Sequence, residues 1–166
     1  MDLFFLKYDI REEMVKNTYS WQEIVFALRN EIITVEDVIK YATYIVNEDT
    51  IGFDTVLEIT CLQCDEDIYQ YLQRLIALEE RQDIADIKAR WLYLILKWLY
   101  GKRNEIENVL EIVEELYERF DYPECIASFV RYMPSETGDL GDIELNRERL
   151  FKNWAAYLES FKEGYS

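Results

Sequence analysis

Apolar residues recur along most of the chain every three or four positions, which is the spacing of one face of an α-helix. The segment that follows Ser20 shows this clearly, because Ser20 and Glu23 form the capping-box pattern that begins many helices. Its apolar positions fall at helical intervals and are Trp21, Ile24, Val25 and Leu28. We therefore predict an amphipathic helix that begins after Ser20.

The same combination of a start signal and an apolar period predicts further helices along the chain. They begin at Thr34, near Asp54, at Asp65, at Asp83, at Asn104, at Pro123 and near Asp142. The segment from Pro123 ends at Pro134, and residues 135–141, which contain two glycines, form a predicted loop before the C-terminal helix. Residues 1–19 do not follow the pattern: residues 3–8 are expected to form a short strand or an irregular arm, and residues 10–15 a helical turn.

These segments predict an all-α fold, a single compact domain of about seven helices over residues 1–166. Connections are short, and we find no internal boundary. The second half of the helix 83–101 is apolar almost all round, which is typical of a central helix. Its predicted core positions are Trp91, Leu92, Ile95, Trp98 and Leu99.

The net charge limits the range of partners. The chain carries 34 Asp and Glu against 18 Lys and Arg, a formal net charge of −16. Nucleic acid is not an expected partner, because phosphates are held by clustered Lys and Arg. Half of the residues are hydrophobic, so the charge belongs to a folded body rather than to a disordered tail. A positively charged protein surface is the expected partner.

Few residues in this sequence support catalysis. Histidine, the side chain most often used for proton transfer near neutral pH, is absent, and no serine lies in a G-x-S-x-G sequence. Asp65, Glu66 and Asp67 resemble a metal-binding cluster, but they also fit a helix cap and first-turn acids, which we favour. We therefore expect no enzymatic activity and no cofactor.

The three cysteines, Cys61, Cys64 and Cys125, are expected to be reduced and buried in helices. Cys61 and Cys64 match the C-x-x-C pattern of zinc and redox sites. No second pair and no histidine completes a zinc site, and the βαβ context of a thioredoxin-like motif is missing.

The predicted helix from Asn104 has the most unbalanced charge, since eight acidic residues and one basic residue lie between Asn104 and Glu124. Five glutamates recur at helical spacing opposite the apolar face, and they are Glu107, Glu111, Glu114, Glu115 and Glu118. Such a stripe either keeps the protein soluble or binds a basic protein. Reversing the charges of Glu111 and Glu114 is expected to leave folding unaffected or slightly improved, because like charges repel along a helix.

Three blocks of the sequence resemble a family of small acidic bacterial proteins of unknown function. They are residues 21–30 (WQEIVFALRN) with 33–39, residues 120–124 with 129–134, and residues 154–158. Position 27 is alanine where the family pattern suggests glycine. The family supplies no catalytic residues. Members of similar size and charge are often suspected to be immunity proteins of bacterial toxin systems, and the resemblance implies that role by analogy.

We predict a non-catalytic acidic interaction protein from the charge, the missing catalytic residues and the resemblance together. The favoured role is that of an immunity protein that binds and neutralises a bacterial toxin. A nuclease is a suitable toxin, because its basic groove accepts an acidic helix face. Two alternatives remain: a helical scaffold or interaction protein and, less favoured, an enzyme that uses carboxylates and a metal.

The sequence also predicts a cytoplasmic protein without a membrane span. The apolar residues 3–6 are followed at once by Lys7 and are too few for a signal peptide. The longest apolar stretch, residues 91–100, is about half as long as a spanning helix requires. The oligomeric state remains open.

Overall fold

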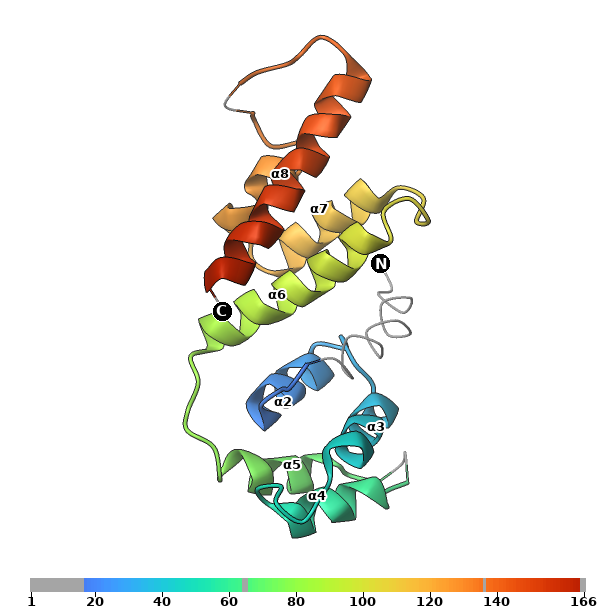
Figure 1. Cartoon of the computed structure of the whole chain (residues 1–166), viewed down its shortest axis with the longest axis vertical. Coiled ribbons are helices and arrows are strands. Elements are labelled where there is room, and N and C mark those ends of the chain that lie inside the picture. The colour runs from blue at the N-terminus through green and yellow to red at the C-terminus, as the bar shows by residue number, and fades with distance from the viewer. Residues whose placement is uncertain (1–16, 64–65, 136, 165–166) are drawn as a thin grey trace. The chain divides into compact units, whose positions relative to one another are not determined.

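The computed structural model describes residues 17–63, 66–135 and 137–164 of the chain. Within these ranges the chain forms seven α-helices, one 3-10 helix and no strand, which confirms the predicted all-α fold (Figure 1). The elements are α2 (Trp21–Arg29), α3 (Val35–Ile45), α4 (Phe53–Thr60), α5 (Tyr69–Ile76), α6 (Ile84–Gly101), α7 (Val109–Arg119), η2 (Glu124–Phe129) and α8 (Ile143–Gly164). The strand or arm predicted for residues 3–8 and the helical turn predicted for residues 10–15 lie outside the described residues, and residues 17–19 are irregular.

The chain divides into two compact units, residues 1–89 and 90–166, and each is described by itself. The division falls within α6, between Ala89 and Arg90. The expectation of one domain over residues 1–166 therefore stays a prediction.

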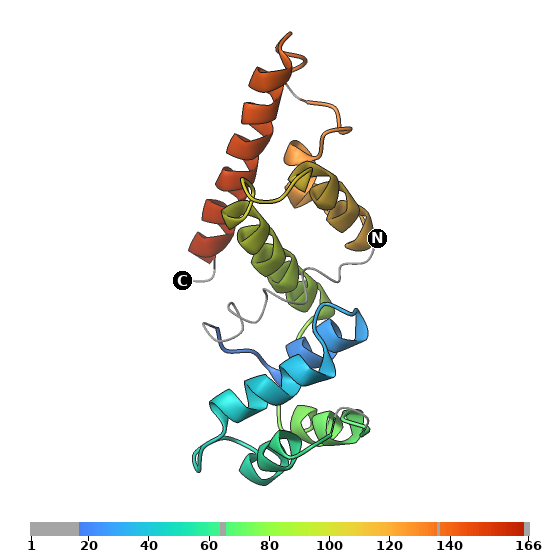
Figure 2. The same cartoon turned by 90° about the vertical axis from the view of Figure 1, so that its right-hand side faces the viewer.

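The first unit packs four short helices around an apolar core. α3 packs against α4, α4 against α5 and α5 against α2, as two views of the chain show (Figures 1 and 2). Among the side chains fully removed from solvent are Ile24, Val38, Val56, Ile59 and Leu72. Both predicted N-terminal caps form as capping boxes, Ser20 with Glu23 and Thr34 with Asp37.

The start of α2 is also held by a residue far away in the sequence. The Glu79 carboxylate accepts hydrogen bonds from the backbone N–H groups of Trp21 and Gln22, at 2.8 and 3.0 Å. The Ser20 hydroxyl accepts a third, from the N–H of Glu23, at 3.1 Å. The first N–H groups of a helix have no partner inside it, so these three bonds satisfy donors that would otherwise need water.

The second unit is held by aromatic contacts between α6, η2 and α8. Trp154 stacks on Phe129 with ring centroids 5.7 Å apart, and Tyr100 meets the same indole edge-on at 5.3 Å. Tyr93 stacks on Phe161 at 4.4 Å. The predicted core positions of α6 are all buried, which confirms the prediction: Trp91, Leu92, Ile95, Trp98 and Leu99. No helix in the part of the chain that the structure describes is long and apolar enough to cross a bilayer.

The helix predicted from Asn104 begins later than expected. Residues 102–108 form turns, and α7 begins at Val109. The reason is local: Asn108 has a left-handed backbone with φ of 58°, which an α-helix does not contain. Asparagine is among the few residues that adopt this conformation readily.

The helix predicted between Pro123 and Pro134 is also shorter. It forms only the six-residue 3-10 helix η2, and Val130 directly after it is extended. Phe129, the last residue of η2, is fully buried against Trp154 of α8, so tertiary packing overrides the helical period of the sequence here.

The predicted loop and the last helix are confirmed. Residues 135–141 contain no helix where they are described, and α8 begins at Ile143. Asp142 caps α8, because its Oδ1 accepts hydrogen bonds from the N–H groups of Glu144 and Leu145 at 2.7 and 3.2 Å.

Candidate functional site

Four of the five glutamates predicted to form a stripe lie on one helix. Glu111, Glu114, Glu115 and Glu118 belong to α7, and we refer to them as the α7 acidic face. Glu107 lies in the preceding turn and is exposed, so the structure does not place it on this helix. Opposite the acidic face, α7 buries an apolar face as predicted, with Val109, Leu110, Val113, Leu116 and Tyr117.

Arg131 binds the middle of the acidic face. Its Nε lies 2.7 Å from Oε1 of Glu114, its Nη2 lies 3.1 Å from Oε2 of the same carboxylate, and its Nη2 lies 3.9 Å from Oε1 of Glu111. The hydrogen bond to Glu114 and the two carboxylate charges raise the pKa of Arg131. This contact could not be predicted from helical spacing, because Arg131 lies 17 residues after Glu114, on another predicted helix.

Glu115 and Glu118, the other two glutamates of the α7 acidic face, interact less with neighbouring side chains. Within the described ranges, Glu115 and Glu118 form no ion pair, and Glu118 is exposed. The acidic face is therefore partly neutralised at Glu114 and keeps its charge toward the C-terminal end of α7.

Two exposed tyrosines adjoin that end. Tyr122 and Tyr132 are 61% and 53% exposed, and the ring of the buried Tyr117 lies between them, with centroid distances of 5.3 and 6.1 Å. Desolvation raises the pKa of Tyr132, and the nearby charges of Glu118 and Glu114 raise it further. We refer to Tyr122 and Tyr132 as the tyrosine pair.

Tyr122 lies in the turn that ends α7. Asp121 and Tyr122 have left-handed backbones, with φ of 61° and 57°, and the N–H of Tyr122 donates a hydrogen bond of 2.8 Å to the carbonyl of Tyr117. Helices commonly end in this way, but glycine is the usual residue at such a position. For tyrosine the conformation is unfavourable by about 1–3 kcal/mol, so the surrounding contacts hold it in place.

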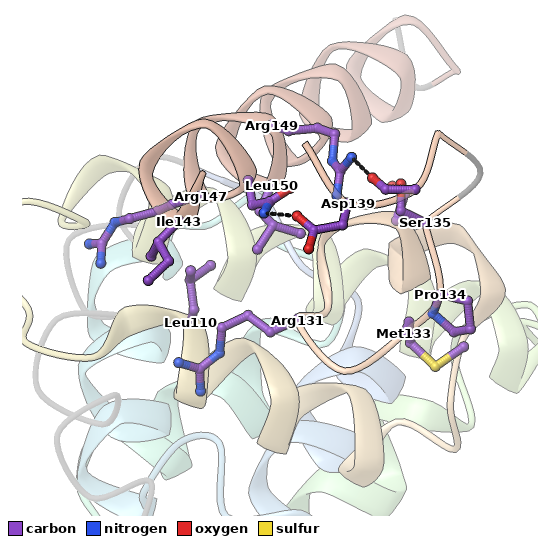
Figure 3. Close-up of a pocket in the computed structure, with 13 residues that line it drawn as sticks. Leu110, Arg131, Met133, Pro134, Ser135, Asp139, Ile143, Arg147, Arg149 and Leu150 are labelled. Atoms are coloured by element: carbon purple, nitrogen blue, oxygen red, sulfur yellow. Dashed lines mark hydrogen bonds between the residues drawn. The ribbon is translucent and has the colours of Figure 1, made fainter. Parts of the chain in front are cut away.

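Arg131 also lines a pocket of about 470 Å³. It is lined by the first turn of α7, residues 128–139 in part, and the first half of α8 (Figure 3). Figure 3 shows Leu110 and Ile143 pointing toward one another across it. The charged residues of the lining are Arg131, Arg147, Arg149 and Asp139.

The wall formed by the loop before α8 is held by polar contacts. Asp139 Oδ1 accepts hydrogen bonds from the side chain of Asn146 and the N–H of Gly141, both at 2.8 Å. These bonds, and the charge of Arg149, lower the pKa of Asp139. Arg149 Nη1 donates to the hydroxyl of Thr137 at 2.9 Å and to the carbonyl of Gly138 at 2.6 Å. The loop is thus held against α8 by hydrogen bonds from two residues of that helix, Asn146 and Arg149.

The cysteines differ from expectation in their burial. Cys61 ends α4 and Cys125 lies in η2, and both are free thiols with exposed side chains, so the prediction of buried residues is wrong for these two. The reason is that the apolar face of each short element is filled by other residues, such as Ile59 and Ile126. Cys64 lies outside the described residues.

The helix predicted to begin at Asp65 begins later, at Tyr69, with Ile68 at the N-cap position and no side-chain cap. Asp67 Oδ1 accepts a hydrogen bond from the N–H of Tyr69 at 3.0 Å, next to the start of α5. Asp65 lies outside the described residues. Among the residues that the structure describes, no group of three or more Cys, Asp or Glu is placed to hold a metal ion.

The chain belongs to the family DUF2247, described as an uncharacterized protein conserved in bacteria, whose model matches residues 10–162. This confirms the resemblance to a bacterial family of unknown function. No curated protein and no solved structure matches the chain.

Proposed function

We propose that this protein is a non-catalytic interaction protein that binds a basic surface of a partner protein through the α7 acidic face and the tyrosine pair. The observation that carries the proposal is the position of exposed carboxylates beside two exposed tyrosines at the end of one helix. Neither feature alone distinguishes an interface from an ordinary surface, but together they provide both charge and aromatic contact area.

The chemistry of the patch suits arginine and lysine. Tyrosine is enriched at protein interfaces, because its ring offers a large contact area and its hydroxyl a hydrogen bond. A guanidinium also packs on a tyrosine ring, as Arg103 does on Tyr100 within this protein at 4.0 Å. Glu118 lies close enough to Tyr132 to affect its titration, so one incoming cation would meet both groups.

The partner we propose is a bacterial toxin, and the protein is then its immunity protein in the cytoplasm. A net charge of −16 attracts a basic toxin over long range and speeds the encounter. A toxin that cleaves nucleic acid has a basic groove, and an acidic helix with flanking aromatic residues can cover that groove without any chemistry of its own.

The first experiment tests whether the partner exists. The protein is co-expressed with the product of the neighbouring gene, and the two are tested for co-purification and for rescue of growth. Co-purification with a basic toxin domain supports the proposal. Failure to bind that product would leave the protein as a helical scaffold and overturn the immunity role.

The second experiment tests the surface. The double variant Glu115→Lys with Glu118→Lys is compared with Glu148→Lys and Glu159→Lys, which make the same charge change at exposed positions of α8. We expect the α7 variant to slow association by about tenfold or more at low salt and to reduce its salt dependence, with a much smaller effect of the α8 variant. Equal effects of the two would place the interface elsewhere.

The tyrosines have a matched control in the first unit. Tyr122→Ala is expected to speed dissociation, since loss of an aromatic anchor acts mainly on the off-rate. Tyr44→Ala removes a tyrosine of similar exposure, 64% against 61%, from α3. An unchanged off-rate for Tyr122→Ala would remove the tyrosine pair from the proposed interface.

A further inference from the structure

The charged residues that line the pocket beside α8 are mostly basic, unlike those of the chain as a whole. Three arginines and one aspartate line it, whereas the chain as a whole carries a net charge of −16. Local charge decides which ligands a pocket accepts, because exposed charges farther away than about 10 Å are screened at ordinary salt. Arg131 is already paired with Glu114, so Arg147 and Arg149 are the residues that give this lining its positive charge for an anion.

The arginines of the pocket still have free hydrogen-bond donors. Arg131 uses Nε and Nη2 on Glu114, and Arg149 uses Nη1 on the loop. A guanidinium has five N–H donors, so each of the two side chains keeps others for a ligand. The carboxylate of Asp139 is already bound through Oδ1 by Asn146 and the backbone, which limits its repulsion of an anion.

The opposite wall is apolar. Leu110, Met133 and Leu150 line the pocket, and Ile143 at its edge is 84% exposed. A large aliphatic side chain with this exposure contributes little to the fold, and here it points across the pocket toward Leu110 (Figure 3). Pockets of about 300–1,000 Å³ commonly bind small molecules, and 470 Å³ is more than a bare anion fills.

We propose that this pocket binds a small monocarboxylate with an apolar body, with its carboxylate at the arginines and its hydrocarbon part against Leu110, Ile143 and Leu150. This site adjoins the proposed protein interface at Arg131, but the proposal does not rest on that interface. A carboxylate fits better than a phosphate, because Glu111 and Glu114 already lie on Arg131 and would repel a doubly charged group more strongly.

The proposal is tested with octanoate as the probe, by titration calorimetry and by backbone amide NMR shifts. We expect saturable binding at one site, with the largest shifts in residues 137–150. Octylammonium, which has the same chain and the opposite charge, is expected not to bind there. Absence of saturable octanoate binding, or equal binding of octylammonium, would overturn the proposal.

Two variants on the same turn of α8 localise the site. Ile143→Glu places a carboxylate on the pocket wall and should weaken octanoate binding about tenfold or more, which corresponds to about 1.4 kcal/mol. Leu145→Glu is the matched control, because Leu145 is 49% exposed and does not line the pocket. Both substitutions suit the first turn of a helix, which favours acids, so the fold should be retained.

Equal weakening by the two variants would show that octanoate binds elsewhere. A second copy of this chain is the other occupant to exclude, and sedimentation of the wild-type protein and of Ile143→Glu does so. Self-association of the wild type that Ile143→Glu abolishes would make the pocket an interface between copies and would overturn the small-molecule proposal.

Discussion

The guanidinium of Arg131 holds the carboxylate of Glu114 by two hydrogen bonds, Nε to Oε1 at 2.7 Å and Nη2 to Oε2 at 3.1 Å. This pair fixes the segment after η2 to the middle of α7. Arg131 belongs to two surfaces, because the side chain that binds the α7 acidic face also lines the pocket beside α8.

Breaking this pair should reduce stability. The side chains of Arg131 and Glu114 are 43% and 20% exposed, so solvent weakens the interaction, and Glu114→Gln should cost about 0.5–1 kcal/mol. Glu114→Lys should cost more, because it places two cations together. The ion pair with Arg131 therefore leads to a different prediction for Glu114 than like-charge repulsion along the helix alone. Denaturant melts of Glu114→Gln, Arg131→Gln and the double variant measure the coupling, and a value of zero would contradict the prediction.

Truncation of Trp98 should be strongly destabilising. The side chain is 7% exposed and belongs to the predicted core of α6, so Trp98→Ala should cost about 3–5 kcal/mol. Lys97→Ala, at the exposed neighbouring position, is the control and should have little effect. A loss below about 1 kcal/mol in denaturant melts would show that Trp98 is not a core residue.

Removal of the Glu79 carboxylate should destabilise the first unit. Glu79→Ala leaves the N–H groups of Trp21 and Gln22 without their partner, and loss of a helix cap typically costs about 0.5–2 kcal/mol. Glu80→Ala removes the neighbouring exposed carboxylate and should have almost no effect. Hydrogen exchange of the first amides of α2 should become faster in the first variant alone, and unchanged rates would argue against this cap.

The two exposed thiols should react without denaturant. Variants that keep only Cys61 or only Cys125 are treated with Ellman's reagent in the folded state. Both should react fully, since both side chains are exposed. Desolvation raises the pKa of Cys125, so its rate should reach half of its maximum at a pH above the ordinary value for a thiol. A Cys125 thiol that reacts only after unfolding would contradict its exposed position.

The loop before α8 should respond to acid through Asp139. Hydrogen bonds from Asn146 and Gly141 lower the pKa of Asp139 in the folded protein, so this carboxylate stabilises the fold above its unfolded pKa of about 3.9. That contribution is lost as the pH falls through the lower folded value. Asn146→Ala should raise the pKa of Asp139 in an NMR titration, whereas Asn153→Ala, on the same helix, should not. An unchanged pKa in Asn146→Ala would show that this hydrogen bond does not stabilise the charged form.

Local rules were enough to predict much of this fold. The caps at Ser20 and Thr34 form as predicted, and α8 begins next to Asp142 as predicted, because a cap needs only residues within one turn of the helix start. The buried face of α6 was predicted for a similar reason, since the period of apolar residues and the lack of a polar face are properties of one segment.

The charge of α7 follows from its residues alone, whereas the side chains that this charge contacts depend on how the helices pack. Arg131 reaches Glu114 across 17 residues, and Glu79 reaches the start of α2 across 57 and 58 residues. Arg131 lines the same pocket as Arg147 and Arg149 of α8, although it comes from a different segment of the chain. Such contacts depend on how separate elements pack, and the helical period within one segment carries no information about which distant side chain will lie against it.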